Sequence, residues 1–222
     1  MIQAEDLRKV YRRRTGNLSA LDGVSLHVKA SECVVLLGPS GSGKSTLLNM
    51  LGGLLRPSSG QVLLDGVDLY SLPPAARVRL RREKIGFVFQ SFHLVPYLTA
   101  AENVAVALNL RARGKVPGQD EAIALLTRVG LGDRVEHVPD ELSVGECQRV
   151  ALARAVAGSP MVILADEPTG NLDPDSAAVV AEHLRRFSKE GAAVVVVTHD
   201  PQLAQIADRT LWLEGGKVRE RK

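Results

Sequence analysis

The segment Gly38 to Ser45, which reads GPSGSGKS, constrains the fold of this chain more than any other segment. It fills every specified position of the phosphate-loop pattern G-x-x-x-x-G-K-[ST]. The apolar run 33–37 comes directly before it, and the helix-like run 46–51 follows directly. A strand, a loop and a helix in this order form the context in which the pattern binds a nucleotide triphosphate. We therefore expect an α/β core built around this segment.

The residue types of the loop explain how it would hold phosphates. Three glycines let successive backbone N–H groups turn inward without Cβ clashes, and the helix that begins near Lys44 points its positive dipole end at the anion. Lys44 adds a positive charge near the β- and γ-phosphates, and Ser45 can offer its hydroxyl to Mg²⁺. The expected phosphate-binding residues are Gly38, Pro39, Ser40, Gly41, Ser42, Gly43, Lys44, Ser45 and Thr46.

Length and composition set limits around this core. With 222 residues, 45% of them hydrophobic, the chain can form one large domain with a full core. No apolar run approaches the roughly 18 residues that span a bilayer, and residues 1–6 carry acids where a signal peptide has basic residues. We therefore expect the chain to stay in the cytosol. Cys33 and Cys147 are too few and too far apart for a disulfide framework or a metal site, so we expect reduced thiols, with Cys33 buried in a strand.

Two basic clusters stand out against a net charge of only +3: Arg12 to Arg14, and five cationic residues within 77–84. Nucleic-acid binding needs a basic patch of this kind, but no aromatic residues are interleaved with these clusters and only 4% of all residues are aromatic. We therefore do not expect nucleic acid as a partner. A solvated face and a surface near anionic lipid headgroups both remain open.

Periodicity along the chain predicts the order of its elements. Residues 2–11 and 21–28 alternate apolar and polar residues, which is typical of half-buried antiparallel strands. Further strands are expected at 62–64, 85–89, 161–165 and 192–198, a hairpin at 209–219, and helices at 173–189 and from 200 onward. Residues 91–157 are helical in character, with capping boxes at 99–102 and 143–146 and a break between two helical runs at 113–118. The pattern predicts a helical insert on an α/β core.

Charged and polar residues at the ends of the buried strands are the candidates for chemistry. Asp166 is expected on the Mg²⁺ side, and Glu167 is expected to act as a general base or to orient the attacking water. His199 follows another buried strand at the edge where parallel sheets collect ligands, so a γ-phosphate contact and a structural role are both possible. Tyr11 could stack on an adenine ring or only cap a strand edge.

Taken together, these segments resemble the ATP-binding subunit of an ABC transporter across nearly the whole chain. In that family's terms, Gly38 to Ser45 is the Walker A motif, Val162 to Asp166 is the Walker B strand and Asn171 to Asp173 is the D-loop. The signature sequence LSGGQ is present as Leu142 to Glu146, which reads LSVGE. The resemblance implies an ABC ATPase fold in a single domain, 1–222. Such a fold has a P-loop NTPase core with a parallel sheet, an N-terminal antiparallel β subdomain and a helical insert at about 91–157.

The resemblance also implies roles for single residues. Glu167 is then the catalytic base, His199 the switch histidine and Tyr11 the adenine-stacking aromatic. Gln90 is the Q-loop glutamine, which acts in catalysis and, with Ser45 and Asp166, at the metal. Ser143, Gly145 and Glu146 would bind the nucleotide of a second copy, because the start of their helix makes a second anion site. The implied cofactors are ATP and Mg²⁺, and the implied assembly is a head-to-tail homodimer that forms on ATP.

Residues 92–104 and 167–173 are similar to one branch of the family, which contains LolD, MacB and FtsE. This similarity implies a cytoplasmic ATPase, peripheral on the inner membrane, that drives separate transmembrane permease subunits and exports or extracts a lipoprotein, a lipid or a drug. An FtsE-like ATPase that regulates envelope proteins without moving a solute is the alternative. A soluble factor acting on DNA or ribosomes usually resembles two fused cassettes or carries a long coiled-coil insert, and this sequence has neither. Branch membership does not fix the cargo.

Val144 departs from the family pattern, because the signature sequence has a glycine there. A β-branched side chain restricts the backbone and the approach of the partner's phosphate, whereas glycine restricts neither. We therefore expect this chain to close on ATP less readily than a relative with glycine at this position.

Overall fold

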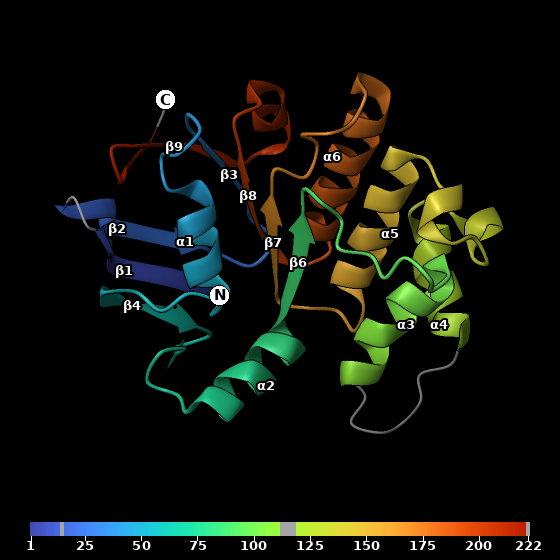
Figure 1. Cartoon of the computed structure of the whole chain (residues 1–222), viewed down its shortest axis with the longest axis horizontal. Helices are drawn as coiled ribbons and strands as arrows, with labels where there is room; N and C mark the ends of the chain where they lie inside the picture. Colours follow the sequence, from blue (N-terminus) through green and yellow to red (C-terminus); the bar gives the residue numbers. More distant parts are fainter. Residues whose placement is uncertain (14–15, 112–118, 221–222) are drawn as a thin grey trace.

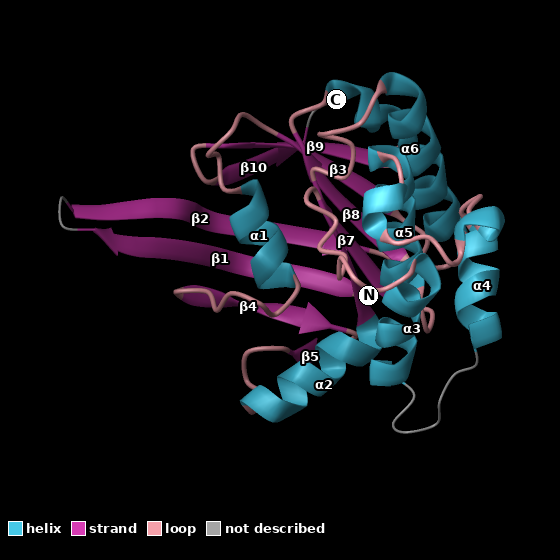
Figure 2. Cartoon of the chain, turned by 45° about the vertical axis from the view of Figure 1, so that its right-hand side comes forward, coloured by secondary structure: helices cyan, strands magenta, loops and turns pink. Residues whose placement is uncertain are grey.

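The structure is a computed structural model that describes residues 1–13, 16–111 and 119–220. A six-stranded sheet stands at its centre, and an antiparallel sheet lies at one end (Figures 1 and 2). Three helices lie at the other end: α3 (Ala100–Arg111), α4 (Gln119–Arg128) and α5 (Val144–Val156). The predicted α/β core with an antiparallel start and a helical insert is confirmed.

The central sheet has the strand order β10-β9-β3-β8-β7-β6. Its strands are β3 (Cys33–Leu37), β6 (Ile85–Phe89), β7 (Val162–Asp166), β8 (Ala193–Thr198), β9 (Arg209–Glu214) and β10 (Lys217–Glu220). All neighbouring strands run parallel except the hairpin of β9 and β10. The pairing sets Leu37 beside Thr198 and Phe89 beside Asp166. The loops that follow β3, β6, β7 and β8 therefore meet at one edge of the sheet.

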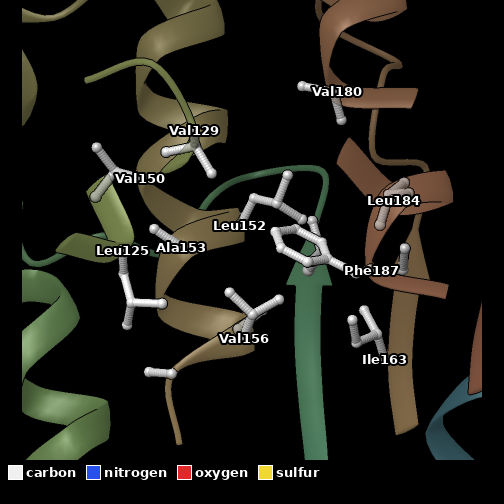
Figure 3. Close-up of a cluster of buried hydrophobic side chains, with 14 of the residues drawn as sticks. Leu125, Val129, Val150, Leu152, Ala153, Val156, Ile163, Val180, Leu184 and Phe187 are labelled. Atoms are coloured by element: carbon white, nitrogen blue, oxygen red, sulfur yellow. The ribbon is translucent and has the colours of Figure 1, made fainter. Parts of the chain in front are cut away.

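Side chains of the central sheet alternate between two cores, because both of its faces are covered. Val34 and Leu36 of β3 pack with the antiparallel sheet and with α1 (Lys44–Leu51). Cys33 and Val35 of the same strand pack with the core of α3, α4, α5 and α6 (Pro174–Lys189). Figure 3 shows that second core, where side chains of α5 and α6 meet around Phe187. Burial on both faces explains the continuous apolar runs in the sequence.

The antiparallel sheet has the order β2-β1-β4-β5. Its strands are β1 (Ile2–Arg13), β2 (Gly16–Val28), β4 (Ser59–Leu64) and β5 (Val67–Asp68). The alternation in the sequence arises because this sheet packs one face on α1 and leaves much of the other exposed. The long hairpin of β1 and β2 brings Tyr11 to the phosphate loop.

The two predicted capping boxes are present. The backbone N–H of Glu102 donates to Oγ1 of Thr99, and Glu102 accepts from the N–H of Thr99. Ser143 and Glu146 make the same reciprocal pair at the start of α5. These bonds satisfy N–H groups that a helix leaves open at its N-terminus, which is why both helices begin where they do.

The structure also adds elements and corrects one. The basic cluster 77–84 lies on a helix, α2 (Pro74–Lys84), which the sequence did not predict. This helix buries none of its residues, so its sequence lacks the apolar periodicity that indicates a helix. The helix predicted to start at 200 is a 3₁₀ helix, Pro201–Ile206, and not an α-helix. Short 3₁₀ turns also cover Gly132–Arg134 and Pro139–Glu141. The predicted break at 113–118 and Arg14 lie outside the described residues. The extent of the single domain, 1–222, stays a prediction.

Both cysteines are free thiols in buried positions. Burial raises the pKa of Cys33 to about 12 and also raises the pKa of Cys147. The prediction of free thiols with Cys33 buried in a strand is confirmed, and the burial of Cys147 makes both thiols packing residues.

Candidate nucleotide-binding and catalytic site

The phosphate loop follows β3 and turns into α1 at Lys44. Gly43 has a φ of 104°, and a Cβ there would lie 2.5 Å from the carbonyl oxygen of Ala20. A Cβ on Gly38 would lie 2.3 Å from the carbonyl oxygen of Leu213. Only glycine fits these two positions, so the two glycines that the phosphate-loop pattern specifies are required by the close packing of the loop against neighbouring backbone.

Two groups of the loop fit a phosphate chain. Lys44 is buried, and its Nζ donates to the carbonyl oxygens of Gly38 at 2.7 Å and Pro39 at 3.1 Å. The buried Oγ of Ser42 has no hydrogen-bond partner among the described residues. A buried ammonium group and a buried hydroxyl with free hydrogen-bonding capacity, both at the start of a helix, are what anionic oxygens require.

A cavity of about 630 Å³ opens above this loop. Tyr11 of β1 lies in its wall, together with Ser40, Lys44 and Thr46. Glu167 closes another part of the wall. The β1–β2 hairpin adds three lining residues that the sequence analysis did not select: Arg12, Leu18 and Ala20. Leu18 pairs with Tyr11 across the hairpin, Arg12 follows Tyr11 on β1, and Ala20 lies two residues after Leu18 on β2, so only the register of that hairpin identifies them.

Ser45 and Asp166 lie together, as the magnesium prediction requires. Oγ of Ser45 donates to Oδ1 of Asp166 at 3.0 Å. Burial raises the pKa of Asp166, and the hydrogen bond from Ser45 opposes that shift. A hydroxyl and a carboxylate beside a phosphate cradle fit Mg²⁺, which protein sites bind through one or two carboxylates and substrate phosphates. The metal role of these residues stays a prediction.

Glu167 follows β7, and its side chain bridges Lys44 of the phosphate loop and the end of β8. Its Oε1 lies 3.7 Å from Nζ of Lys44. Its Oε2 accepts from Oγ1 of Thr198 at 2.8 Å and from the backbone N–H of His199 at 3.2 Å, and it lies 3.0 Å from Nδ1 of His199. The φ of Glu167 is 45°, in the left-handed region that few residues adopt. Strain of this kind is typical of functional positions.

Gln90 follows β6 at the same edge but bonds to a different loop. Its Nε2 donates to Oδ1 of Asn171 at 3.3 Å, and Nδ2 of Asn171 donates to the carbonyl oxygen of Gln90 at 3.3 Å. A Cβ on Gly170 would lie 2.9 Å from Nε2 of Gln90. The structure thus joins the predicted Q-loop to the predicted D-loop, and Gln90 is not among the lining residues of the nucleotide cavity.

The signature residues form the start of α5 and are not among the residues that line that cavity. A Cβ on Gly145 would lie 2.5 Å from Oγ of Ser176, so glycine is required there by packing on α6. Glu146 caps the helix and pairs with Arg134 at 3.3 Å. The backbone hydrogen bond from Ser143 is the main reason why the pKa of Glu146 is lowered. Its contact with the nucleotide of a second copy stays a prediction.

A second cavity of about 590 Å³ lies between α2, β6, α3 and α5, and the sequence analysis did not predict it. We call it the apolar groove. Its exposed apolar residues are Leu54, Val78, Val106 and Leu110. Burial lowers the pKa of Arg111 and of Arg154 in its wall. Among the described residues, the buried Nε of Arg82 and the buried Nη1 of Arg111 have no hydrogen-bond partner.

Arg154 ties this groove to the signature helix. It lies in the last turn of α5 and donates to the carbonyl oxygens of Phe92 and His93, which follow Gln90. Both of those residues have positive φ values, 55° and 51°. Arg154 of α5 therefore anchors the backbone of the segment after β6.

In the part of the chain that the structure describes, no helix is long and apolar enough to cross a bilayer.

Comparisons with known proteins agree with these features. LolD of Shewanella oneidensis, named a lipoprotein-releasing system ATP-binding protein, is 46% identical over 217 residues, which cover 97% of this chain and 94% of LolD. MacB of Syntrophobacter fumaroxidans, named a macrolide export ATP-binding/permease protein, is 44% identical over 221 residues, which cover 98% of this chain but 31% of MacB.

Solved structures agree equally well. The dimeric structure of MJ0796, a bacterial ABC transporter cassette, has a TM-score of 0.93 at 42% identity and covers 100% of this chain and 98% of that one. A second dimeric structure of MJ0796, described as a post-hydrolysis state bound to ADP and phosphate, also has a TM-score of 0.93, at 41% identity and with the same coverage. Residues 21–170 match the family described as ABC transporter. The chain belongs to the ABC transporter family, as one of its ATP-binding cassettes.

Proposed function

We propose that this chain hydrolyses ATP and thereby drives separate membrane subunits from the cytoplasmic face of the membrane. The observation that carries the proposal is the position of Glu167. Its carboxylate lines the nucleotide cavity, faces Lys44 and is fixed from behind by Thr198 and His199. A general base must lie beside the place where a water attacks, and this carboxylate meets that requirement next to the phosphate loop.

The residues divide the reaction between them. Lys44 and the backbone N–H groups of the loop hold the β- and γ-phosphates. Ser45 and Asp166 would hold Mg²⁺, which neutralises charge on the phosphates when bound. Glu167 would take the proton of the attacking water, and Tyr11 and Leu18, which line the cavity from the hairpin, would cover the adenine base.

Glu167→Gln is the direct test. The amide can still hydrogen-bond a water but cannot accept its proton, so Mg²⁺·ATP binding should persist while turnover falls by a factor of about 10² to 10⁴. Gel filtration with ATP should then show a trapped dimer. A variant that hydrolyses ATP at the wild-type rate would refute the role of Glu167.

The proposed assembly is a head-to-tail dimer with two ATPs between the copies. The start of α5 supports it, because Ser143 and Gly145 present a helix N-terminus to an anion although they do not line the chain's own cavity. The relative MJ0796 is described as dimeric, which adds support by similarity.

The apolar groove supports the link to membrane subunits. Apolar side chains together with buried, unpaired guanidinium nitrogens suit a short amphipathic segment that carries a carboxylate. Phe89 and His93 of the groove lie one residue before and three residues after Gln90, so a partner seated there would contact the segment that carries this predicted catalytic residue. The names of LolD and MacB suggest a lipoprotein or a drug as cargo, and an FtsE-like regulator remains the alternative.

A charge placed in the groove tests this docking. Leu110 is 56% exposed, so Leu110→Glu should leave folding and basal ATPase activity unchanged but abolish co-purification with the membrane subunits from detergent. Val179→Glu is the matched control, since Val179 is also exposed but lies on α6, outside the groove. If both variants keep the membrane subunits, the groove is not the docking site.

A further inference from the structure

Thr198 is the last residue of β8 and one of the few polar side chains that are buried, with 1% of its surface exposed. Its Oγ1 lies 2.8 Å from Oε2 of Glu167. The backbone N–H of Asp200 donates to the same Oγ1 at 3.0 Å. The hydroxyl therefore stands between the loop after β8 and the predicted catalytic carboxylate.

The two bonds fix the direction of the hydroxyl hydrogen. A threonine hydroxyl has one hydrogen to donate and two lone pairs. The N–H of Asp200 uses a lone pair, and an ionised carboxylate can only accept. Thr198 must consequently donate its hydrogen to Oε2 of Glu167.

The two oxygens of Glu167 are thus unequal. Oε2 accepts from the Thr198 hydroxyl and from the His199 backbone N–H, and it lies 3.0 Å from Nδ1 of His199. Oε1 is 3.7 Å from Nζ of Lys44, the group aimed at the phosphates. The His199 side chain is 60% exposed, whereas Thr198 is buried, so Thr198 is the more rigid of the two anchors.

We propose that Thr198 is a positioning residue that saturates Oε2 of Glu167 and thereby makes Oε1 the oxygen that accepts the proton of the attacking water. The inference rests on the proposed ATPase function. In the step, an O–H bond of water breaks and its proton goes to Oε1, the water oxygen bonds to the γ-phosphorus, and the bond from that phosphorus to the bridging oxygen breaks to release ADP. Thr198 exchanges no atom with the substrate.

Thr198→Val tests this role, because valine keeps the shape of threonine but has no hydroxyl. A misplaced catalytic group costs up to about 10²-fold, so we expect kcat to fall by about tenfold or more while KM and the Kd of Mg²⁺·ATP stay within about twofold. Thr198→Ser keeps the hydroxyl and should restore kcat to within about threefold of wild type. If Thr198→Val does not fold, Thr198→Ala removes the same hydroxyl without adding a methyl group to the core.

Asp200→Ala is the control for the loop. Its side chain caps the 3₁₀ helix through the N–H of Gln202, so the variant loosens the same loop yet keeps the backbone N–H that bonds Thr198. It should keep most of the wild-type kcat. The inference is overturned if Asp200→Ala is as slow as Thr198→Val, if Thr198→Ser is not better than Thr198→Val, or if Thr198→Val is as fast as wild type.

Glu167→Gln separates this inference from the proposed function. If Glu167→Gln turns over ATP normally, the proposed function fails and with it the role of Thr198. If Glu167→Gln is inactive but Thr198→Val is normal, only the inference about Thr198 fails.

Discussion

Val144 gives a prediction in which activity and stability change in opposite directions. It is the first residue of α5, its φ is not positive, and 50% of its surface is exposed. The backbone at Val144 does not need glycine. At Gly145 packing is the constraint, because a Cβ there would lie 2.5 Å from Oγ of Ser176. The valine is therefore half exposed without backbone strain, at the helix start where the proposed dimer would place a second copy's nucleotide.

The size of the expected effect follows from these facts. Surplus methyl groups in a close contact cost about 1–3 kcal/mol, and the lower value corresponds to about fivefold in an equilibrium constant. Because the valine is half exposed, we take the lower value, and Val144→Gly should raise the ATPase rate of the isolated subunit by about fivefold at saturating ATP, where dimer closure limits the rate.

The same substitution should destabilise the fold slightly. Half-burial of a valine contributes about 1 kcal/mol, and glycine is less favourable in a helix by about 0.3–0.5 kcal/mol. In a chain of this length, a loss of that size lowers Tm by about 3–6 °C. Val144→Ala, which keeps Cβ but removes both methyls, should give most of the gain in rate with a smaller loss in Tm.

Steady-state ATPase assays and thermal unfolding of the three purified proteins check this reasoning. A rate for Val144→Gly that is unchanged or lower, together with the expected fall in Tm, would show that the valine does not hinder closure. Gly145→Ala serves as the opposite control, because its Cβ must displace Ser176 and should lower stability without any gain in rate.

Two further predictions concern the hairpin and the back of the sheet. Tyr11→Ala should weaken the binding free energy of ATP by about 1–3 kcal/mol, whereas Tyr11→Trp should not, since stacking tolerates any aromatic ring. Isothermal titration with ATP measures the affinity of both variants. If both bind ATP as tightly as wild type, Tyr11 is only a structural residue. The pKa of Asp208 is lowered, chiefly by hydrogen bonds from Arg185, so its contribution to stability is present above its ordinary pKa of 3.8 and is lost as pH falls through the lower folded value. Denaturant titrations should accordingly show Asp208→Asn less stable than wild type at pH 7 and the two proteins converging in acid; a difference independent of pH would contradict the ion pair as its source.

Local patterns were enough to predict most elements and several site residues. The phosphate loop, both capping boxes and the buried strands β3, β7 and β8 were predictable because each depends on residues that are neighbours in sequence. The helix α2 was not, since it buries no residue and has no apolar period. The 3₁₀ helix Pro201–Ile206 shared its N-cap signal with longer helices, so the signal fixed its start but not its type.

The sequence by itself determined which residue types are present and at which strand ends they stand. Only the tertiary structure decided that Lys44, Glu167 and Thr198 meet, that Gln90 bonds to Asn171, and that Arg12 and Leu18 line the nucleotide cavity. It also created the apolar groove from four separate elements. The reason is that these contacts depend on the order and register of strands far apart in the chain, and no periodicity within one segment carries that information.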